Sequence, residues 1–396
     1  MSDKRNVALM LDLGWPYARH VDTFAGTQSY AHQCGNWLCH VDEFPHTRLP
    51  ARRGKKLPYD GIIARATSEL AERARKCGVP VVNVWWNSPA EKLPTICPDI
   101  VSGGRLAAEH LMQRGYRHFA SLSARRDRSQ TKQRTLFRSA VEEEGFDCLQ
   151  ETTTSDYPLN HSRRTWQSFE RKIESWIDKW ELPIGILVTH VDVTSRHIVV
   201  ACQRRGLKFP DDVGLISCHD EKSMVVNPPP SLTSLEINYQ KIGYQAAELL
   251  DRLMDGESEP KELKQLHPVK IVARQSTGFV LTDDELVSAA IRYINQHADQ
   301  PIGVEEVVSG VYGSRRTLER RFRDSLGRSV AGEIRRLRIG RAKQFLRDTD
   351  LSLAVVAVRC GFLSAQSLCE IFRRETDMTP IDFRRKKSGE DTTSCG

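Results

Sequence analysis

Short β-branched runs alternate with longer helical patterns over the first 275 residues, and this alternation restricts the fold more than any other feature of the chain. The run VALMLDL at 7–13 is typical of a buried strand, and the pattern at 21–32 is typical of a helix. Further strands are expected at 37–44, 59–65, 79–86, 116–123, 185–190 and 213–218. Alternation of this kind predicts parallel sheets with helices on both faces.

Helices are expected between these strands, at 67–77, 103–115, 131–145, 163–180, 194–205 and 239–256. More than ten elements within about 270 residues indicate two doubly wound α/β lobes rather than one sheet. In folds of this kind, ligands bind in a cleft at the carboxyl ends of the strands. The first part of the chain is therefore predicted to bind a small molecule between two lobes.

The pattern changes near residues 275–282, and everything that follows is helical. Helices are expected at 283–298, 304–311, 330–347, 353–362 and 364–375, with a further helix that begins near Ser314 as its N-cap. A pair of helices joined by a short turn thus occurs twice. The predicted organisation is a two-lobed domain at 1–276, a linker at 277–284, an all-α domain at 285–387 and a disordered tail at 388–396.

The positive charge of the chain is concentrated in this helical part. The whole chain has a formal net charge of +7, while residues 301–387 contain 19 lysines and arginines against 11 acidic residues. Within this range arginines outnumber lysines by 16 to 3. Arginine is preferred where planar, bidentate contact to phosphate or guanine matters. The helical part therefore has the charge pattern of a nucleic-acid-binding module, although an Arg-rich solvated surface is the simpler alternative.

The segment VYGSRRTLERRF at 311–322 fits the second helix of a helix-turn-helix, which lies in the major groove and is held by a narrow apolar stripe. Leu318 and Phe322 form that stripe in the first unit, and Leu368 and Phe372 form it in the second. The remaining residues of each helix face outward, toward base edges and phosphates. Candidate DNA contacts are Ser314, Arg315, Arg316, Glu319, Arg320 and Arg323 in the first unit, and Ser364, Gln366, Ser367, Glu370 and Arg373 in the second.

The closing stretch CGFLSAQSLCEIFRRETDMTPIDFRR resembles the DNA-binding domain of AraC/XylS-type regulators, and SRRTLERRFRDSLGRSV resembles its first unit. Gly361, Phe362, Pro380 and Phe383 match the pattern of that family. Asp377 stands where the family usually has glycine, and Glu370 stands where arginine is common. The resemblance implies a DNA-binding transcription factor that acts on double-stranded operator DNA, with RNA polymerase as a further partner. Activation is expected because most of that family activates, but the sequence itself does not decide between activation and repression.

The front of the chain has a resemblance of its own. The stretches DIVSGGRLAAEHLMQRGYRH and LKFPDDVGLISCHD are similar to the effector domains of LacI/GalR-type repressors and to periplasmic sugar-binding proteins. That family usually has Asp-Asn where this chain has Asp99 and Ile100, and Asn where it has Val191. A domain of this type ahead of an AraC-type module is an unusual order, found in regulators of xylose utilisation. The resemblance implies a homodimer that responds to a pentose, with D-xylose expected and a different sugar as the alternative.

Most candidate sugar-binding residues follow the predicted strands, where charged, amide and aromatic groups could hold a sugar. These are Trp15, Tyr17, Arg19, Trp86, Asn87, Asp192 and Asp220, and Glu236 lies in the crossover SLTSLEI. The resemblance adds Gln133 and Arg134 from the predicted helix at 131–145. The resemblance makes Asp192 and Asp220 the expected bidentate contacts to hydroxyls, and it leaves open whether Gln133 or Arg134 reaches the ligand. Each carboxylate could instead cap a helix, and each aromatic side chain could simply pack between the lobes.

Other site types find little support in the sequence. The motifs G-x-S-x-G, H-E-x-x-H and the P-loop are absent, and His32, His40 and His46 do not share a helical face, so we expect no catalysis, no cofactor and no metal. The cysteines form no C-x-x-C pair, no secretory signal or membrane span is recognisable, and a cytoplasmic, nucleoid-associated protein is expected. The rival functions are a non-catalytic sugar-binding or transport protein and a sugar-metabolising enzyme, each with an accessory basic domain.

Overall fold

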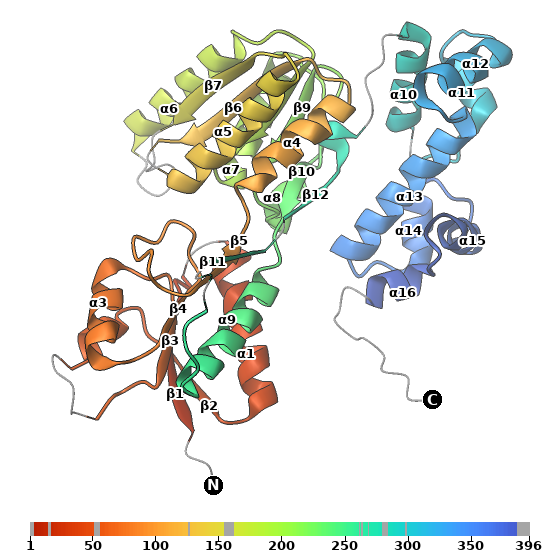
Figure 1. Cartoon of the computed structure of the whole chain (residues 1–396). Helices are drawn as coiled ribbons and strands as arrows, with labels where there is room; N and C mark the ends of the chain where they lie inside the picture. Colours follow the sequence, from red (N-terminus) through yellow and green to blue (C-terminus); the bar gives the residue numbers. More distant parts are fainter. Residues whose placement is uncertain are drawn as a thin grey trace. The chain divides into compact units, whose positions relative to one another are not determined.

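The structure is a computed structural model (Figure 1). It describes residues 4–14, 17–50, 56–125, 127–153, 162–260, 262, 264–267, 269–278, 284–297 and 299–385. Contacts divide the chain into two compact units, residues 1–277 and residues 278–396. The predicted tail at 388–396 and residues 279–283 of the predicted linker lie outside the described residues. No helix in the described ranges is long and apolar enough to cross a membrane.

The first unit contains two six-stranded sheets, as the alternation of elements predicts. Lobe A is built on the sheet with strand order β11-β5-β4-β3-β1-β2, in which all pairings are parallel. Its strands are β1 (Arg5–Met10), β2 (Trp37–Val41), β3 (Gly61–Ala64), β4 (Val81–Asn83), β5 (Thr95–Pro98) and β11 (Lys264–His267). Its helices are α1 (Ala18–Cys34), α2 (Pro45–Arg48), α3 (Ser68–Cys77) and α9 (Tyr239–Met254).

Lobe B is built on the sheet with strand order β12-β10-β9-β8-β6-β7, in which β12 alone pairs antiparallel among the described strands. Its strands are β6 (His118–Ala124), β7 (Cys148–Thr153), β8 (Ile184–Val188), β9 (Val213–Ser217), β10 (Thr233–Glu236) and β12 (Lys270–Val272). Its helices are α4 (Ser102–Gln113), α5 (Arg128–Glu143), α6 (Arg163–Ile177), α7 (Asp192–Arg204) and α8 (Lys222–Val225), and the short 3₁₀ helix η1 (Gln275–Thr277) ends the unit.

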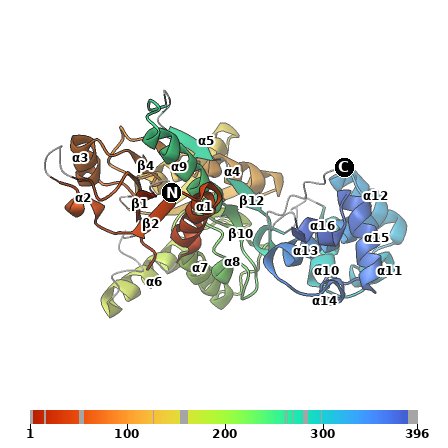
Figure 2. The same ribbon diagram turned by 90° about the horizontal axis from the view of Figure 1, so that it is seen from below.

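Helices α1 and α9 pack closely on one side of the lobe A sheet, although about 200 residues separate them along the chain (Figures 1 and 2). Each helix has a glycine at the contact. A Cβ atom added at Gly26 would lie 1.8 Å from the carbonyl oxygen of Gln240, and one at Gly243 would lie 2.0 Å from that of Thr23. Only a residue without a side chain fits at these two positions. This contact fixes the start of α1, and with it Arg19, beside the start of α9.

The second unit is all-helical and has two separate apolar cores. Its helices are α10 (Glu285–Gln296), α11 (Val304–Gly310), α12 (Arg315–Leu326), α13 (Val330–Asp348), α14 (Leu353–Arg359), α15 (Ala365–Thr376) and α16 (Pro380–Arg385). The first core gathers α10, α11, α12 and the start of α13, and the second gathers the end of α13 with α14 and α15. The long helix α13 therefore joins two helix-turn-helix subdomains, as the repeat in the sequence predicts.

Candidate functional site

A cavity of about 480 Å³, called the main cavity below, lies between lobe A and lobe B, at the strand ends where the sequence predicts a ligand. Leu11 follows β1 and Val84 follows β4 on the side of lobe A, while Ala124 ends β6 on the side of lobe B. Thr189 and Cys218 come directly after β8 and β9. The expected strand at 79–86 is wrong at its end, because β4 stops at Asn83. This early end leaves the following residues free to line the cavity.

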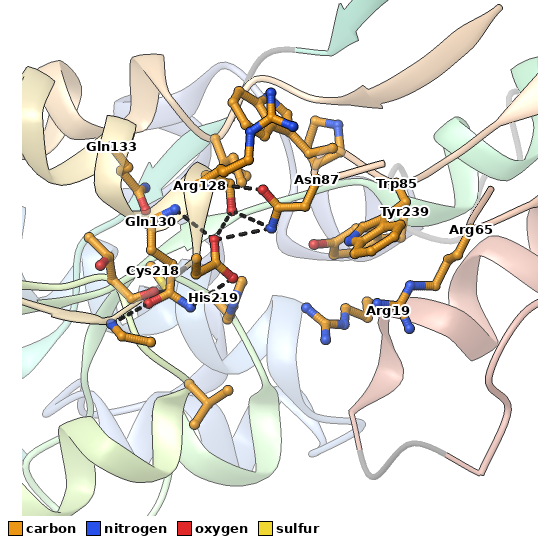
Figure 3. A pocket seen from close by; sticks show the side chains of 18 of the residues that line it. Arg19, Arg65, Trp85, Asn87, Arg128, Gln130, Gln133, Cys218, His219 and Tyr239 are labelled. Atoms are coloured by element: carbon orange, nitrogen blue, oxygen red, sulfur yellow. Dashed lines mark hydrogen bonds between the residues drawn. The ribbon is translucent and has the colours of Figure 1, made fainter. Parts of the chain in front are cut away.

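A hydrogen-bond network centred on Asp127 joins the two lobes at this cavity, and Figure 3 labels its members Asn87 and Gln130. Asp127 caps α5, and its Oδ1 accepts hydrogen bonds from the backbone amide of Gln130 at 3.0 Å and from the hydroxyl of Ser129 at 2.6 Å. The side chain of Asn87, which follows β4 in lobe A, donates to the same oxygen at 3.1 Å. Its Oδ1 in turn accepts from the backbone amide of Ser129 at 2.9 Å. Asn87 is thus a polar link between the lobes.

Two buried donors at the cavity have no hydrogen-bond partner among the described residues. They are Nε2 of Gln133, a residue that is 2% exposed, and Nε1 of Trp86. A buried donor without an acceptor costs free energy, and that cost is removed if either side chain turns its donor toward a bound acceptor. The hydroxyl and ring oxygens of a sugar are suitable acceptors. The ring of Trp86 also has the Lys264 ammonium 4.0 Å from its centroid.

The side of the cavity that lies across from the Asp127 network is aromatic and cationic (Figure 3). The guanidinium of Arg65 lies 4.7 Å from the centroid of the Trp85 ring, and Tyr239 and Arg19 line the same side. Burial and the nearby charge of Arg19 lower the pKa of Arg65. Aromatic faces pack against the C–H faces of a sugar ring, and guanidinium groups donate to its hydroxyls. This side therefore complements the amide and carboxylate groups around Asp127.

Two histidines of the cavity are uncharged at neutral pH. Burial lowers the pKa of His20 to about 4 and that of His219 to about 3. Nδ1 of His20 lies 2.6 Å from the carbonyl oxygen of Asp12, which can only accept, so Nδ1 carries the proton and Nε2 is an acceptor. The two imidazoles therefore add polar groups to the cavity wall without adding charge.

The structure separates the predicted sugar-binding residues into four groups. Arg19, Trp86, Asn87 and Gln133 line the main cavity. Tyr17, Asp220 and Glu236 line a neighbouring cavity of about 190 Å³, which shares Arg19, Val191, His219 and Tyr239 with the first. Asp192 and Arg134 line neither cavity. Trp15 lies outside the described residues.

The two carboxylates expected to bind hydroxyls have partners within the protein. Asp192 is 1% exposed and accepts from the Ser217 hydroxyl at 2.5 Å and from the Glu221 amide at 3.0 Å, and burial raises its pKa to about 6. Asp220 forms an ion pair with Arg274 at 2.6 Å and another with Lys222. Burial alone would raise the pKa of Asp220, but these cations hold it below its usual value. Both residues brace the loop that follows β9.

Several residues of the main cavity were not expected from the sequence: Arg65, Trp85, Asp127, Ser129, Gln130, His219 and Tyr239. Trp85 and His219 are adjacent to residues that the strand-end rule singles out. Asp127 has the signal of a helix cap, an acidic residue directly ahead of a helical pattern, and it fills that role. The same carboxylate caps α5 and lines the main cavity. The sequence pattern indicates only the helix cap, so it does not predict that Asp127 lines the cavity.

In the second unit, α12 has the apolar stripe predicted for it. Leu318 and Phe322 are 0% exposed and belong to the first core, and Ser314 caps the helix by accepting from the Thr317 amide. Leu368 and Phe372 hold α15 in the same way in the second core. The expected placement of these four residues is confirmed. Each helix is held from one side, and the other side is left for solvent or a partner.

Comparison with known proteins identifies both units. A family model described as a periplasmic binding protein-like domain matches residues 108–277, and one described as a helix-turn-helix domain matches residues 311–386. The regulatory protein SoxS of Salmonella typhimurium is 30% identical over 106 residues, which are 27% of this chain and 99% of SoxS. The chain belongs to the AraC-type transcriptional regulators.

Two further comparisons extend over nearly the whole regulator. The xylose operon regulatory protein of Escherichia coli strain K12 is 27% identical over 389 residues, which cover 96% of this chain and 97% of that protein. A solved structure described as the xylose-binding transcription activator xylR aligns with a TM-score of 0.66 and 25% identity, and covers 97% of this chain and 99% of its own. The regulator therefore shares its order of domains with these proteins, an α/β effector-type domain followed by the helix-turn-helix domain.

The regulator exposes most of the side chains that were predicted to meet DNA. Ser314, Arg315, Arg316, Arg320, Arg323, Ser364, Gln366, Glu370 and Arg373 are exposed, while Glu319 and Ser367 are partly buried. Arg315 pairs with Glu305, and Arg320 lies 3.7 Å from Asp324. These pairs are more than 60% exposed on both sides, so they contribute little stability and can be exchanged for phosphates. The guanidinium groups of α12 are not sequestered in the core.

In α15 the outward residues are mainly polar. Gln366 donates to Glu370 at 3.0 Å, one turn further along the helix. An acceptor at Glu370 disfavours a phosphate at that position, whereas the Gln366 amide can be redirected to an adenine. Arg373 is exposed near the end of the helix. The two motifs therefore present different chemistry, with a cationic first helix and a mainly polar second helix.

Proposed function

We propose that this regulator is a D-xylose-dependent activator of xylose-utilisation genes, acting as a cytoplasmic, nucleoid-associated homodimer with RNA polymerase as a partner. The observation that carries the sugar assignment is the main cavity, in which the Asp127 network lies across from an aromatic and cationic side. The likeness to xylose operon regulators over nearly the whole chain supports the choice of D-xylose. A different sugar is the alternative.

The proposed mechanism uses the two lobes as a clamp. A sugar that contacts both Asn87 of lobe A and the start of α5 in lobe B favours one relative arrangement of the lobes over others. It shifts the equilibrium only as far as its preference for that arrangement allows. We propose that this arrangement lets the two copies in the dimer place their helix-turn-helix units on neighbouring half-sites. Operator affinity should fall steeply with salt, because phosphate contacts supply much of it.

The rival enzymatic function has weak support at this site. Catalysis on sugars by general acid and base commonly needs two carboxyl groups that flank the reacting bond. Among the described residues that line the main cavity, Asp127 is the one carboxylic acid, and it is engaged with Asn87 and Ser129. A cavity built in this way favours binding over turnover.

Replacing Asn87 with alanine is expected to weaken D-xylose binding by about 10-fold to 100-fold, because the change removes a hydrogen-bond link to a charged group at the lobe boundary. Operator affinity measured without sugar should stay unchanged. Isothermal titration calorimetry measures sugar affinity, and intrinsic tryptophan fluorescence, to which Trp85 and Trp86 at the cavity contribute, gives a second readout.

Asn227 provides the matched control, because it is exposed and lines neither cavity. An N227A variant should bind the sugar as the wild type does. If N87A and N227A bind D-xylose equally well, the main cavity is not the sugar site. If wild-type protein binds another pentose and not D-xylose, the choice of sugar is wrong and the cavity assignment stands.

A further inference from the structure

The turn of each helix-turn-helix motif has a large apolar side chain that is almost fully exposed to solvent. Tyr312, between α11 and α12, is 99% exposed, and Leu363, between α14 and α15, is 85% exposed. These are the two most exposed large hydrophobic residues in the described part of the chain, and Val358 follows at 67%. The two most exposed large hydrophobic side chains in the described part of the chain thus lie in the equivalent turns of a duplicated unit. Chance exposure of single apolar residues does not predict this coincidence.

Both residues lie next to the end of the helix that a helix-turn-helix motif inserts into DNA. Tyr312 is two positions before Ser314, the N-cap of α12, and Leu363 directly precedes Ser364, the N-cap of α15. The N-terminal residues of such a helix meet base edges in the major groove. Side chains on the preceding turn are therefore at the edge of the groove, beside the sugar-phosphate backbone.

The backbone of the first turn is unfavourable for the residue that it holds. Tyr312 has a φ of +53°, in the left-handed region that side chains with a Cβ atom seldom adopt. At the corresponding position of the second turn, two residues after the last residue of α14, stands Gly361 with a φ of +72°. A glycine would remove the strain at Tyr312, and the nearly complete exposure of its ring provides no packing that offsets it. Strain of this kind is concentrated at functional positions.

The charge around the turn indicates the chemistry of the partner. Arg315 and Arg316 follow Tyr312 within four residues and are exposed. A surface that combines guanidinium groups with an aromatic ring fits a polyanion that also has apolar faces, and the deoxyriboses and thymine methyl groups of DNA provide such faces. The apolar residues are continuous with α12 and α15, which already present the predicted DNA contacts.

We propose that Tyr312 and Leu363 are DNA contacts of the regulator, in which the Tyr312 ring and the Leu363 side chain pack against the sugar-phosphate backbone at the edges of two major grooves. This inference rests on the DNA-binding role of the second unit and not on the identity of the sugar. Both contacts are apolar, so they add affinity without adding to the number of phosphates neutralised.

The test uses the full-length protein and duplexes selected by the wild type from a pool of random sequences, in parallel with and without D-xylose. Fluorescence anisotropy on the selected duplex is expected to show about 10-fold weaker binding for Tyr312→Gly, since the variant loses the apolar surface that the ring buries against the deoxyriboses. The melting temperature of the same variant should rise by about 4 °C, because glycine relieves the backbone strain. Lower affinity together with higher stability excludes partial unfolding as the cause.

Further variants separate the contribution of the ring from that of the hydroxyl and of the backbone. Tyr312→Phe should bind within about threefold of the wild type, and Leu363→Ala should weaken binding by about threefold to 10-fold. In Y312G the slope of log affinity against log salt concentration should stay unchanged, because the variant loses no charge and so releases as many counterions as the wild type. An arginine variant should have a shallower slope. Ile381→Ala is the matched control, an apolar residue of α16 that is 50% exposed and should leave binding unchanged.

Unchanged affinity of Y312G for the selected duplex would overturn the proposal. So would a Tyr312→Phe variant as weak as Y312G, because the contact would then require the hydroxyl and not the ring. If Y312G bound DNA normally but no longer recruited RNA polymerase, the turn would be a polymerase contact and the proposal would again be wrong. Selection that enriched no sequence at all would count against the DNA-binding role itself, a result distinct from these.

Discussion

Replacing Glu333 with glutamine is expected to lower the free energy of unfolding of the second unit by about 3 kcal/mol. Glu333 is buried, with a side chain that is 1% exposed, and it lies in the first turn of α13. Its carboxylate accepts from Nε of Arg328 at 2.5 Å and from Arg336 at 2.6 and 2.8 Å. Glutamine removes the negative charge that faces the two guanidinium groups in these contacts. Both guanidinium groups are about one-third exposed, so we expect the lower end of the range for a broken buried pair.

The change should be measured by two probes of chemical denaturation. All seven tryptophans lie within residues 1–277, so tryptophan fluorescence follows the first unit, whereas circular dichroism at 222 nm follows helices of both units. In E333Q the circular dichroism transition should move to lower denaturant while the fluorescence transition stays. Glu375 is the control, because its pairs with Arg335 and Arg374 are partly exposed and a glutamine there should cost less than about 1 kcal/mol. Equal stability of E333Q and E375Q would contradict the expectation.

The stability of the second unit is expected to depend on pH through Glu333. Burial raises the pKa of Glu333, but the hydrogen bonds and charges of Arg336 and Arg328 outweigh it, and the pKa lies below the usual value of 4.5. Its contribution to stability is therefore complete above about pH 4.5 and is lost as the pH falls through the lower value of the folded state. Below about pH 4.5 the stability of the wild type should fall more steeply than that of E333Q.

Replacing Arg274 with methionine is expected to lower the free energy of unfolding of the first unit by about 3–5 kcal/mol. The Arg274 side chain is fully buried, donates to the backbone carbonyl of Leu232 at 2.8 Å, and pairs with Asp220, which is 7% exposed. Methionine fills a similar volume but deprives the buried Asp220 carboxylate of one of its two cations, leaving the pair with Lys222. Because His219 adjoins Asp220 and lines the main cavity, D-xylose affinity should also fall.

A double-mutant cycle shows whether the pair, rather than the bulk of the side chain, is responsible. R274M combined with Asp220→Leu removes both charges, and the double variant should be more stable than R274M alone. Arg252, whose pair with Glu257 is about half exposed, serves as the control, and R252M should change stability by less than about 1 kcal/mol. A cycle with no coupling between Arg274 and Asp220 would show that the ion pair does not brace this loop.

The sequence predicts the helical unit well because its signals are local. The spacing of Leu318 and Phe322, and of Leu368 and Phe372, marks the buried side of each helix, and Ser314 marks the start of α12. Edge strands are harder to predict. β11 has the sequence KQLH and is mostly exposed, so it lacks the apolar run that identifies a buried strand, and its pairing with β5 joins residues about 170 positions apart.

The site is only partly predictable, for a related reason. The strand-end rule places Arg19, Trp86 and Asn87 at the cavity because chain topology brings strand ends together. It does not reveal whether a carboxylate at a strand end is already paired. The buried partner of Asp220, Arg274, lies 54 residues away, so this pairing cannot be found from spacing along the chain.

Sugar held in the first unit is expected to change how tightly the regulator binds DNA. The direct measurement is fluorescence anisotropy of wild-type protein on its selected duplex, with and without saturating D-xylose. We expect D-xylose to lower the dissociation constant at least about 10-fold, a coupling of about 1.4 kcal/mol. Equal dissociation constants, under conditions where tryptophan fluorescence shows the sugar to be bound, would contradict the account.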